Sequence, residues 1–212
     1  MLQLDDVKKS FSGRTVLKIP SFQFHSGIYW LKGPNGSGKT TLLRMVAGLL
    51  PFEGNIICNG VSLQRQPVSY RRMVSWAEAE PLYPLFLTGT ELVALYRSIR
   101  KADPKDVDFL IGAFGVDTYI DSPVGTWSAG MTKKISLLLA FIGMPPLVIL
   151  DEPLITLDEK ALTTVSGLIA RRCQDPEALF LLSSHQEADM SLLPAGEEVL
   201  VQNHTLSHAI PI

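Results

Sequence analysis

Nine consecutive residues, G-P-N-G-S-G-K-T-T, constrain the fold of this chain more than any other feature. They fit G-x-x-x-x-G-K-[ST] and lie between an apolar run, Ile28 to Leu31, and a helix-like run, Leu42 to Leu49. A strand, a glycine-rich loop and a helix in this order predict a phosphate-binding loop, because the glycines let backbone N–H groups converge and the helix adds its positive end. The residues expected to hold a nucleoside triphosphate are Gly33, Pro34, Asn35, Gly36, Ser37, Gly38, Lys39, Thr40 and Thr41. A surface turn before a helix is the alternative, although a chance match in such a chain has a probability of about one per cent.

Composition is compatible with a phosphate-binding core. With 212 residues and 46% hydrophobic content, the chain can bury one substantial core with an inserted lobe. The net charge of −2 gives no reason to expect a nucleic-acid partner. Cys58 and Cys173 lack CxxC spacing, so reduced structural thiols are expected. The first ten residues contain acids and no long apolar stretch, which predicts a cytosolic chain without a secretory signal.

The first third of the chain shows the alternation of short strands. Glycines separate these runs, so we predict antiparallel strands around the phosphate loop. The runs are Leu2 to Val7, Val16 to Ile19, Phe22 to Phe24, Ile56-Ile57 and Met73-Val74.

Helical spacing dominates the middle of the chain. Thr90 to Arg100 and Pro104 to Phe114 both show it, and together they predict a helical lobe over about 82–145. The apolar stretch from Ile135 to Leu150 is shorter than the roughly 20 residues of a membrane span. Because Pro145-Pro146 also interrupts it, we interpret it as a helix end followed by a buried strand.

Two later runs, Leu147 to Leu150 and Leu179 to Leu182, are continuously apolar, as in parallel strands covered on both faces. A helix predicted from Asp158 to Arg172 connects them. This βαβ order gathers the residues that follow each strand at one edge of the sheet, which is where open α/β sheets bind ligands.

Asp151 and Glu152 directly follow the first of these strands. An acid in this place is expected to hold Mg²⁺ through water in phosphate-loop enzymes, and the Thr40 hydroxyl is a second candidate ligand. Glu152, one residue further, is our candidate general base. A charged strand end followed by a proline turn is the alternative.

At this point the chain resembles the ATP-binding cassette ATPases, whose motifs occur in order over nearly its whole length. Besides the phosphate loop and L-V-I-L-D-E-P, the segment Trp127 to Met131 is similar to their signature L-S-G-G-Q, in a degenerate S-x-G-M form found in some exporter-type cassettes. The resemblance implies an α/β fold with a RecA-like phosphate-loop core, an N-terminal antiparallel β subdomain and an inserted α-helical subdomain. It implies a single domain over 1–212, with 1–81 and 146–212 forming the core and β subdomain and 82–145 the helical subdomain.

In that family the signature binds the γ-phosphate held by the opposite subunit. The resemblance therefore assigns Ser128 and Gly130 to nucleotide binding. Ser128 is also an ordinary helix N-cap, and a capped helix without a ligand is the alternative.

Three further residues acquire roles from the resemblance. His185 matches the switch histidine that contacts the γ-phosphate, and we assign it to catalysis with Lys39 and Glu152. Asp158 matches the loop that crosses the dimer interface, although it could simply cap its helix. Phe11 stands where an aromatic ring stacks on adenine, or else it is a core phenylalanine beside a turn.

The loop that usually carries a glutamine has none here. Some exporter-like members carry glutamate in this loop, so Glu78 is the preferred substitute and ligand of nucleotide and metal, with Glu80 second. A solvated acidic loop without a nucleotide contact is the alternative.

The resemblance implies a motor subunit that binds and hydrolyses ATP with Mg²⁺, dimerises with a second copy, and drives a separate transmembrane permease. It implies a cytoplasmic location on the inner face of the inner membrane, with Pro81 to Leu87 as a candidate permease contact or else part of the core. A soluble cassette ATPase acting on DNA or ribosomes is the main alternative. A phosphate-loop kinase is the second, but it would not explain Ser128, Gly130 and His185.

Overall fold

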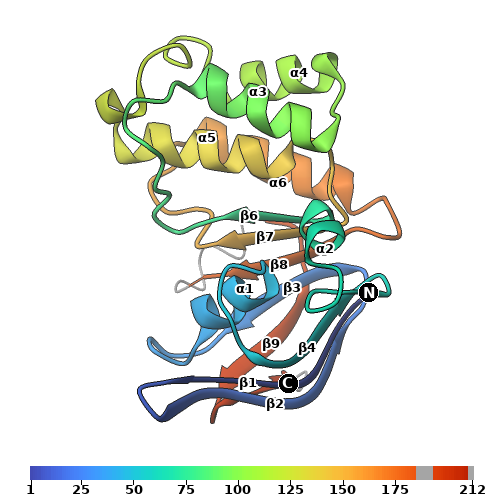
Figure 1. Ribbon diagram of the computed structural model, residues 1–212. Helices are drawn as coiled ribbons and strands as arrows, with labels where there is room; N and C mark the ends of the chain where they lie inside the picture. Colours follow the sequence, from blue (N-terminus) through green and yellow to red (C-terminus); the bar gives the residue numbers. More distant parts are fainter. Residues whose placement is uncertain (185–192, 210–212) are drawn as a thin grey trace.

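The computed structural model describes residues 1–184 and 193–209. Within them, the strands form two sheets, and helices α3, α4 and α5 lie together at one end of the molecule (Figure 1). The helices are α1 (Lys39–Val46), α2 (Pro67–Met73), α3 (Gly89–Arg100), α4 (Pro104–Phe114), α5 (Ala129–Phe141) and α6 (Glu159–Arg172), with a 3₁₀ turn η1 (Val124–Thr126).

The first sheet is antiparallel and has the order β2-β1-β4-β5. Its strands are β1 (Leu2–Phe11), β2 (Arg14–Phe24), β4 (Glu53–Cys58) and β5 (Val61–Ser62). The turn between β1 and β2 needs positive φ at Ser12 and Gly13, which explains the glycine there. The predicted antiparallel strands are therefore present, with Val16 to Ile19 and Phe22 to Phe24 joined in one long strand.

The second sheet has the order β10-β9-β3-β8-β7-β6, and all neighbours except β10 and β9 run parallel. Its strands are β3 (Gly27–Lys32), β6 (Val74–Ala77), β7 (Leu147–Asp151), β8 (Leu179–Ser183), β9 (Glu197–Gln202) and β10 (Thr205–His208). The assignment of Met73-Val74 to the antiparallel strands is wrong, because Met73 ends α2 and β6 pairs parallel with β7. Such short runs carry no information on their partner strand.

Both faces of the parallel sheet are covered. Along β7, Val148 and Leu150 pack into the core shared with the helical lobe, whereas Leu147 and Ile149 pack into the core shared with α1 and the antiparallel sheet. Strands buried on two faces have no polar alternation, which explains their continuously apolar sequence.

Helices α3, α4 and α6 match the predicted helices, whereas α2 was not predicted from the sequence. Asp103 caps the predicted helix α4, and Asp158 caps α6. The Thr88 side chain accepts a hydrogen bond from Glu91 N, which opens α3 one residue before the predicted start. The helix after the phosphate loop begins at Lys39 rather than Leu42 and ends at Val46, because the chain turns at Gly48, where φ is 72°.

Candidate functional site

The phosphate loop connects β3 to α1 at the carboxyl edge of the parallel sheet. Gly38 begins the helix with φ of 105° and offers no side-chain cap, so the first backbone N–H groups of α1 remain available to an anion. The Lys39 ammonium, whose residue is 5% exposed, donates to Gly33 O (2.6 Å) and Pro34 O (3.3 Å) across the loop. Burial lowers the pKa of Lys39, while the carboxylates of Glu152 and Asp151 oppose this shift. The lysine charge is thus held beside the two predicted acids.

A cavity of about 430 Å³ opens on this loop, which is a volume typical of ligand pockets. The buried Ser37 Oγ has no hydrogen-bond partner within the described part of the chain. Unpaired donors and acceptors beside a positive charge suit a polyphosphate, so the residues present fit a bound nucleotide. The cavity is lined by Phe11, Val16, Asn35, Gly36, Ser37, Gly38, Lys39, Thr40 and Thr41.

Phe11 lies at the end of β1 and is 46% exposed, so the alternative of a core phenylalanine is not what the fold shows. Its ring lines the cavity, and the Lys9 ammonium lies 4.7 Å from the ring centroid. An exposed ring that lines a cavity beside the phosphate loop is suited to stacking on a nucleobase.

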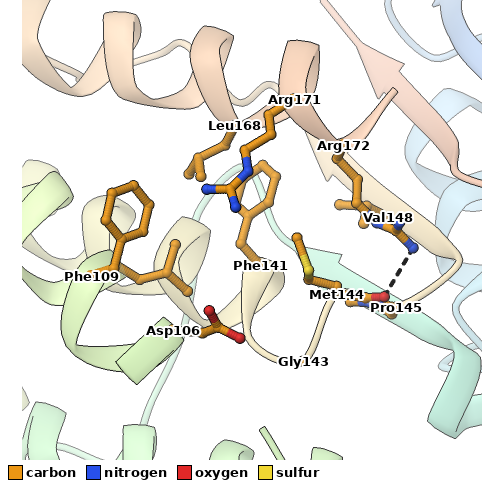
Figure 2. Close-up of a pocket in the computed structure, with 11 residues that line it drawn as sticks. Asp106, Phe109, Phe141, Gly143, Met144, Pro145, Val148, Leu168, Arg171 and Arg172 are labelled. Carbon is orange, nitrogen blue, oxygen red and sulfur yellow. Dashed lines mark hydrogen bonds between the residues drawn. The ribbon is translucent and has the colours of Figure 1, made fainter. Parts of the chain in front are cut away.

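A second pocket lies between α4, the end of α5 and α6 (Figure 2). Phe109, Phe141 and Leu168 line it, and Arg172 Nη2 donates to Met144 O (3.1 Å) at its rim. Its volume of about 50 Å³ is far below that of a nucleotide site. The phosphate-loop cavity is the candidate site because it combines sufficient volume with the Lys39 charge and the unpaired Ser37 hydroxyl.

Asp151 and Glu152 follow β7, as the sequence predicts. Asp151 is 2% exposed, and its Oδ1 accepts a hydrogen bond from the Ser183 hydroxyl at the end of β8. The same Ser183 Oγ accepts from Glu152 N (3.0 Å). Glu152 has φ of 47°, so the chain turns sharply after the buried acid. Ser183 therefore holds the carboxylate of Asp151 and the backbone of Glu152, a role that a serine at a strand end does not reveal in sequence.

Lys133 of α5 is a site residue that sequence reasoning missed. It is 1% exposed, and its ammonium donates to Glu78 O (2.6 Å), Ala79 O (3.1 Å) and Asp151 O (3.1 Å). Burial lowers the pKa of Lys133 to about 8, although the carboxylates of Asp151, Glu152 and Glu78 oppose the shift. In sequence, Lys133 is one of two adjacent lysines near a helix start, which usually indicates a solvated face.

The predicted signature residues lie at the start of α5. Ser128 Oγ accepts from Met131 N (3.2 Å), and Ser128 N donates to Met131 Sδ (3.5 Å), so the methionine takes part in the cap. A Cβ added to Gly130 would lie 3.0 Å from Thr156 O, a tight contact that favours glycine at this position. Ser128 itself is exposed.

Asp158 is the N-cap of α6, because its Oδ1 accepts from Ala161 N (2.9 Å). Its Oδ2 also lies 2.5 Å from the Lys134 ammonium. The hydrogen bonds from Lys134 and Ala161 lower the pKa of Asp158. The capping alternative is therefore present in the fold, and a role of Asp158 at a dimer interface stays a prediction.

The Glu78 carboxylate pairs with Arg44 of α1 at 3.5 Å, and Glu80 is exposed. In the described residues, no group of three or more His, Cys, Asp or Glu side chains could hold a metal ion. Thr40, Asp151 and Glu78 as ligands of Mg²⁺ stay predictions. His185 lies outside the described residues.

The fold and this cavity define a phosphate-loop nucleotide-binding protein with a RecA-like core. A family model, "ABC transporter", matches residues 17–155, well over half of the chain. The chain belongs to the ABC transporter family, and it is an ATP-binding, ATP-hydrolysing subunit.

Named relatives and solved structures agree with this family assignment. The chain is 30% identical over 189 residues to the cytochrome c biogenesis ATP-binding export protein CcmA of Pseudomonas syringae pv. syringae, covering 87% of this chain and 86% of that one. It is 31% identical to the uncharacterized ABC transporter ATP-binding protein YybJ of Bacillus subtilis, covering 94% and 92%. A solved ATP-binding subunit of an ABC transporter superposes with a TM-score of 0.89 at 26% identity, covering 99% and 89%. The ADP-bound and phosphate-bound dimer of the cassette MJ0796 shares the fold, with a TM-score of 0.82 at 15% identity and complete coverage of both chains.

Among the described residues, none of the helices is both long and apolar enough to cross a membrane.

We expect Lys39→Met to weaken ATP binding, because methionine keeps the buried stem but removes a charge-assisted contact. Such contacts contribute about 1.5–3 kcal/mol, which corresponds to roughly 10-fold to 100-fold in affinity. Calorimetric titration with ATP measures the effect. Lys105→Met, at an exposed position of α4, is the matched control and should bind like the wild type. Equal affinity of both variants would contradict the assignment of Lys39.

Proposed function

We propose that two copies of this chain enclose two ATP molecules, each with Mg²⁺, and that closing and opening of this sandwich drives a separate permease. The observation that carries the proposal is the place of the signature. The phosphate-loop cavity is lined by residues between 11 and 41, and Glu152 and Asp151 lie close enough to oppose the fall in the pKa of Lys39 that burial causes. Among the described residues, none of Ser128 to Met131 lines this cavity or acts on Lys39. A γ-phosphate contact to Ser128 would then come from a second copy, where the exposed start of α5 offers its backbone N–H groups.

Within each site we propose that Asp151 and Thr40 hold Mg²⁺ and that Glu152 positions and deprotonates the attacking water. Bound ATP supplies the phosphoanhydride bond that is cleaved. The Ser183 hydroxyl keeps Asp151 aimed by donating to its carboxylate, and Lys39 supplies a positive charge for the terminal phosphates. His185 and Asp158 complete the proposed site, as sensor of hydrolysis and as contact across the interface.

The candidate permease contact is the segment between β6 and α3. Leu82, Leu85 and Phe86 are 89%, 71% and 79% exposed, whereas Tyr83 and Leu87 pack against the core. The segment is anchored next to the signature, since Gly125 N donates to Leu85 O (2.9 Å) and Val124 N to Leu87 O (2.8 Å). An exposed apolar patch on an ordered backbone is typical of a docking site. A permease bound to this segment would hold the chain at the cytoplasmic face of the inner membrane, which is the location that we propose.

The direction of transport that we propose is export. The S-x-G-M signature favours it, and the relatives from Pseudomonas and Legionella are named export proteins. The relatives are named as transporter subunits, which supports a role in transport over an ATPase acting on DNA or ribosomes.

Replacement of Glu152 by Gln should stop turnover while preserving ATP binding, because the amide keeps the size but cannot accept the proton. General-base catalysis contributes about 10²-fold to 10⁴-fold, so kcat should fall by this factor. Phosphate release by the chain with its permease measures it, with Glu80→Gln as the control. Wild-type turnover by Glu152→Gln would show that another residue is the base.

The proposed sandwich makes a separate prediction about assembly. With Mg-ATP, Glu152→Gln should shift from monomer to dimer, and a second change, Ser128→Arg, should prevent this by crowding the phosphate. Light scattering reports the mass. Ser128→Asn keeps the N-cap and is the control that should still dimerise. A dimer that survives Ser128→Arg would contradict a contact of Ser128 across the interface.

The permease contact is tested by Phe86→Ser. Burial of a phenylalanine contributes about 1.5–3 kcal/mol, so the affinity for the permease should fall roughly 10-fold to 100-fold. ATP binding by the isolated chain should not change. Phe109→Ser removes an exposed aromatic ring from α4 and serves as the control in the same co-purification assay. Undiminished co-purification of Phe86→Ser would place the permease elsewhere.

A further inference from the structure

The ammonium group of Lys133 joins three parts of the molecule that contribute to the proposed site. Lys133 belongs to α5, the helix that Ser128 begins, and its three acceptors lie just after β6 and at the end of β7. These strands are neighbours in the parallel sheet. One side chain thus ties the signature helix to the carboxyl ends of two adjacent strands.

Lys133 has no capacity left for a ligand. An ammonium has three N–H donors, and three backbone carbonyls occupy them. The residue is also 1% exposed, so it does not contact ATP or water in the cavity. Any effect on hydrolysis must act through the groups that it holds.

A buried ammonium is costly unless its hydrogen bonds are complete, and an apolar side chain of similar volume often fits such a place equally well. The ammonium differs from an apolar side chain because its three N–H groups bind three carbonyl oxygens and so fix the positions of those carbonyls relative to one another. One carbonyl belongs to Asp151, whose side chain we assign to Mg²⁺, and Glu152 follows directly. The other two begin the loop that leads to the exposed Leu82, Leu85 and Phe86.

We propose that Lys133 is a positioning residue for hydrolysis, which holds the backbone of Asp151 and of the Glu78-Ala79 loop in one fixed relation to α5. The inference rests on the proposed roles of Asp151 and Glu152. It goes beyond them, because it assigns a function to a side chain that contacts neither substrate nor metal. It also gives the permease-facing loop a direct bonded connection to the catalytic strand.

The test compares side chains with three, two and no donors at this position. Lys133→Gln keeps two N–H groups, and Lys133→Met keeps the apolar length with none. Misplaced catalytic groups can cost about 10²-fold in rate, so we expect Lys133→Met to lower kcat by tenfold to a hundredfold, with Lys133→Gln between it and the wild type. The affinity for ATP should stay unchanged, because the phosphate loop is not touched.

Lys105→Met is the control, because Lys105 is exposed on α4 and has no role in the proposed site. All variants are prepared as the full chain. ATPase activity is measured with and without the permease, at a temperature well below the melting temperature of each variant. The rate is expressed per nucleotide-binding site. Amide hydrogen exchange is the second readout. Peptides covering 78–80 and 151–153 should exchange faster in Lys133→Met than in Lys105→Met.

Several results would overturn the proposal. They are a wild-type kcat in folded Lys133→Met, equal losses in Lys133→Gln and Lys133→Met, or a loss of ATP affinity without a fall in kcat. If Lys133→Met does not fold, the kcat and the ATP affinity of Lys133→Gln test the proposal instead. If neither variant folds, Lys133 is needed for folding and the proposal of a positioning role is overturned. A wild-type chain that does not hydrolyse ATP would contradict the proposed function instead, and the exchange measurement would then decide this inference.

Discussion

The parallel pairing of β3, β8, β7 and β6 is the constraint on which the rest of the structure depends. Parallel strands bring their carboxyl ends to one edge, and there the phosphate loop follows β3, Asp151 ends β7 and Ser183 ends β8. The strands are buried on both faces, so side chains at this edge are the first to reach a polar environment. The sheet therefore brings the charged groups of segments that are distant in the sequence to the same edge.

Two buried polar contacts then give this edge its detailed geometry. Ser183 links the ends of β7 and β8 through Asp151 and the amide of Glu152, and Lys133 links the ends of β7 and β6 to α5. Both are fully inside the protein, where an unpaired polar group would be costly, so each contact selects one arrangement of its neighbours. Ser128 lies at the exposed start of the same helix α5. This helix therefore connects the buried contacts of Lys133 to the surface that we propose a second subunit contacts.

The segment between β6 and α3 has one buried side and one exposed side, which suits a segment that we propose contacts the permease. The segment before α3 buries Tyr83 and Leu87 and exposes Leu82, Leu85 and Phe86, so its path is fixed although its outer face has no partner in the described chain. Its backbone is bonded to Val124 and Gly125 at one end and to Lys133 at the other. These hydrogen bonds connect the segment to the residues just before the signature and, through Lys133, to the strand that ends in Asp151.

The sequence by itself determined the phosphate loop, the acids after β7, the βαβ order and the helices α4 and α6, because each depends on residues close together in the chain. It did not assign Met73-Val74 to the correct sheet, since a two-residue apolar run does not specify its partner strand. It also gave no sign of the burial of Lys133, which lies on the side of α5 opposite the apolar residues Ile135, Leu138, Leu139 and Ile142. Only the tertiary structure packs that helix on two sides. The pairing of Glu78 with Arg44 was decided in the same way, because contacts between distant segments depend on the assembled core and not on local spacing.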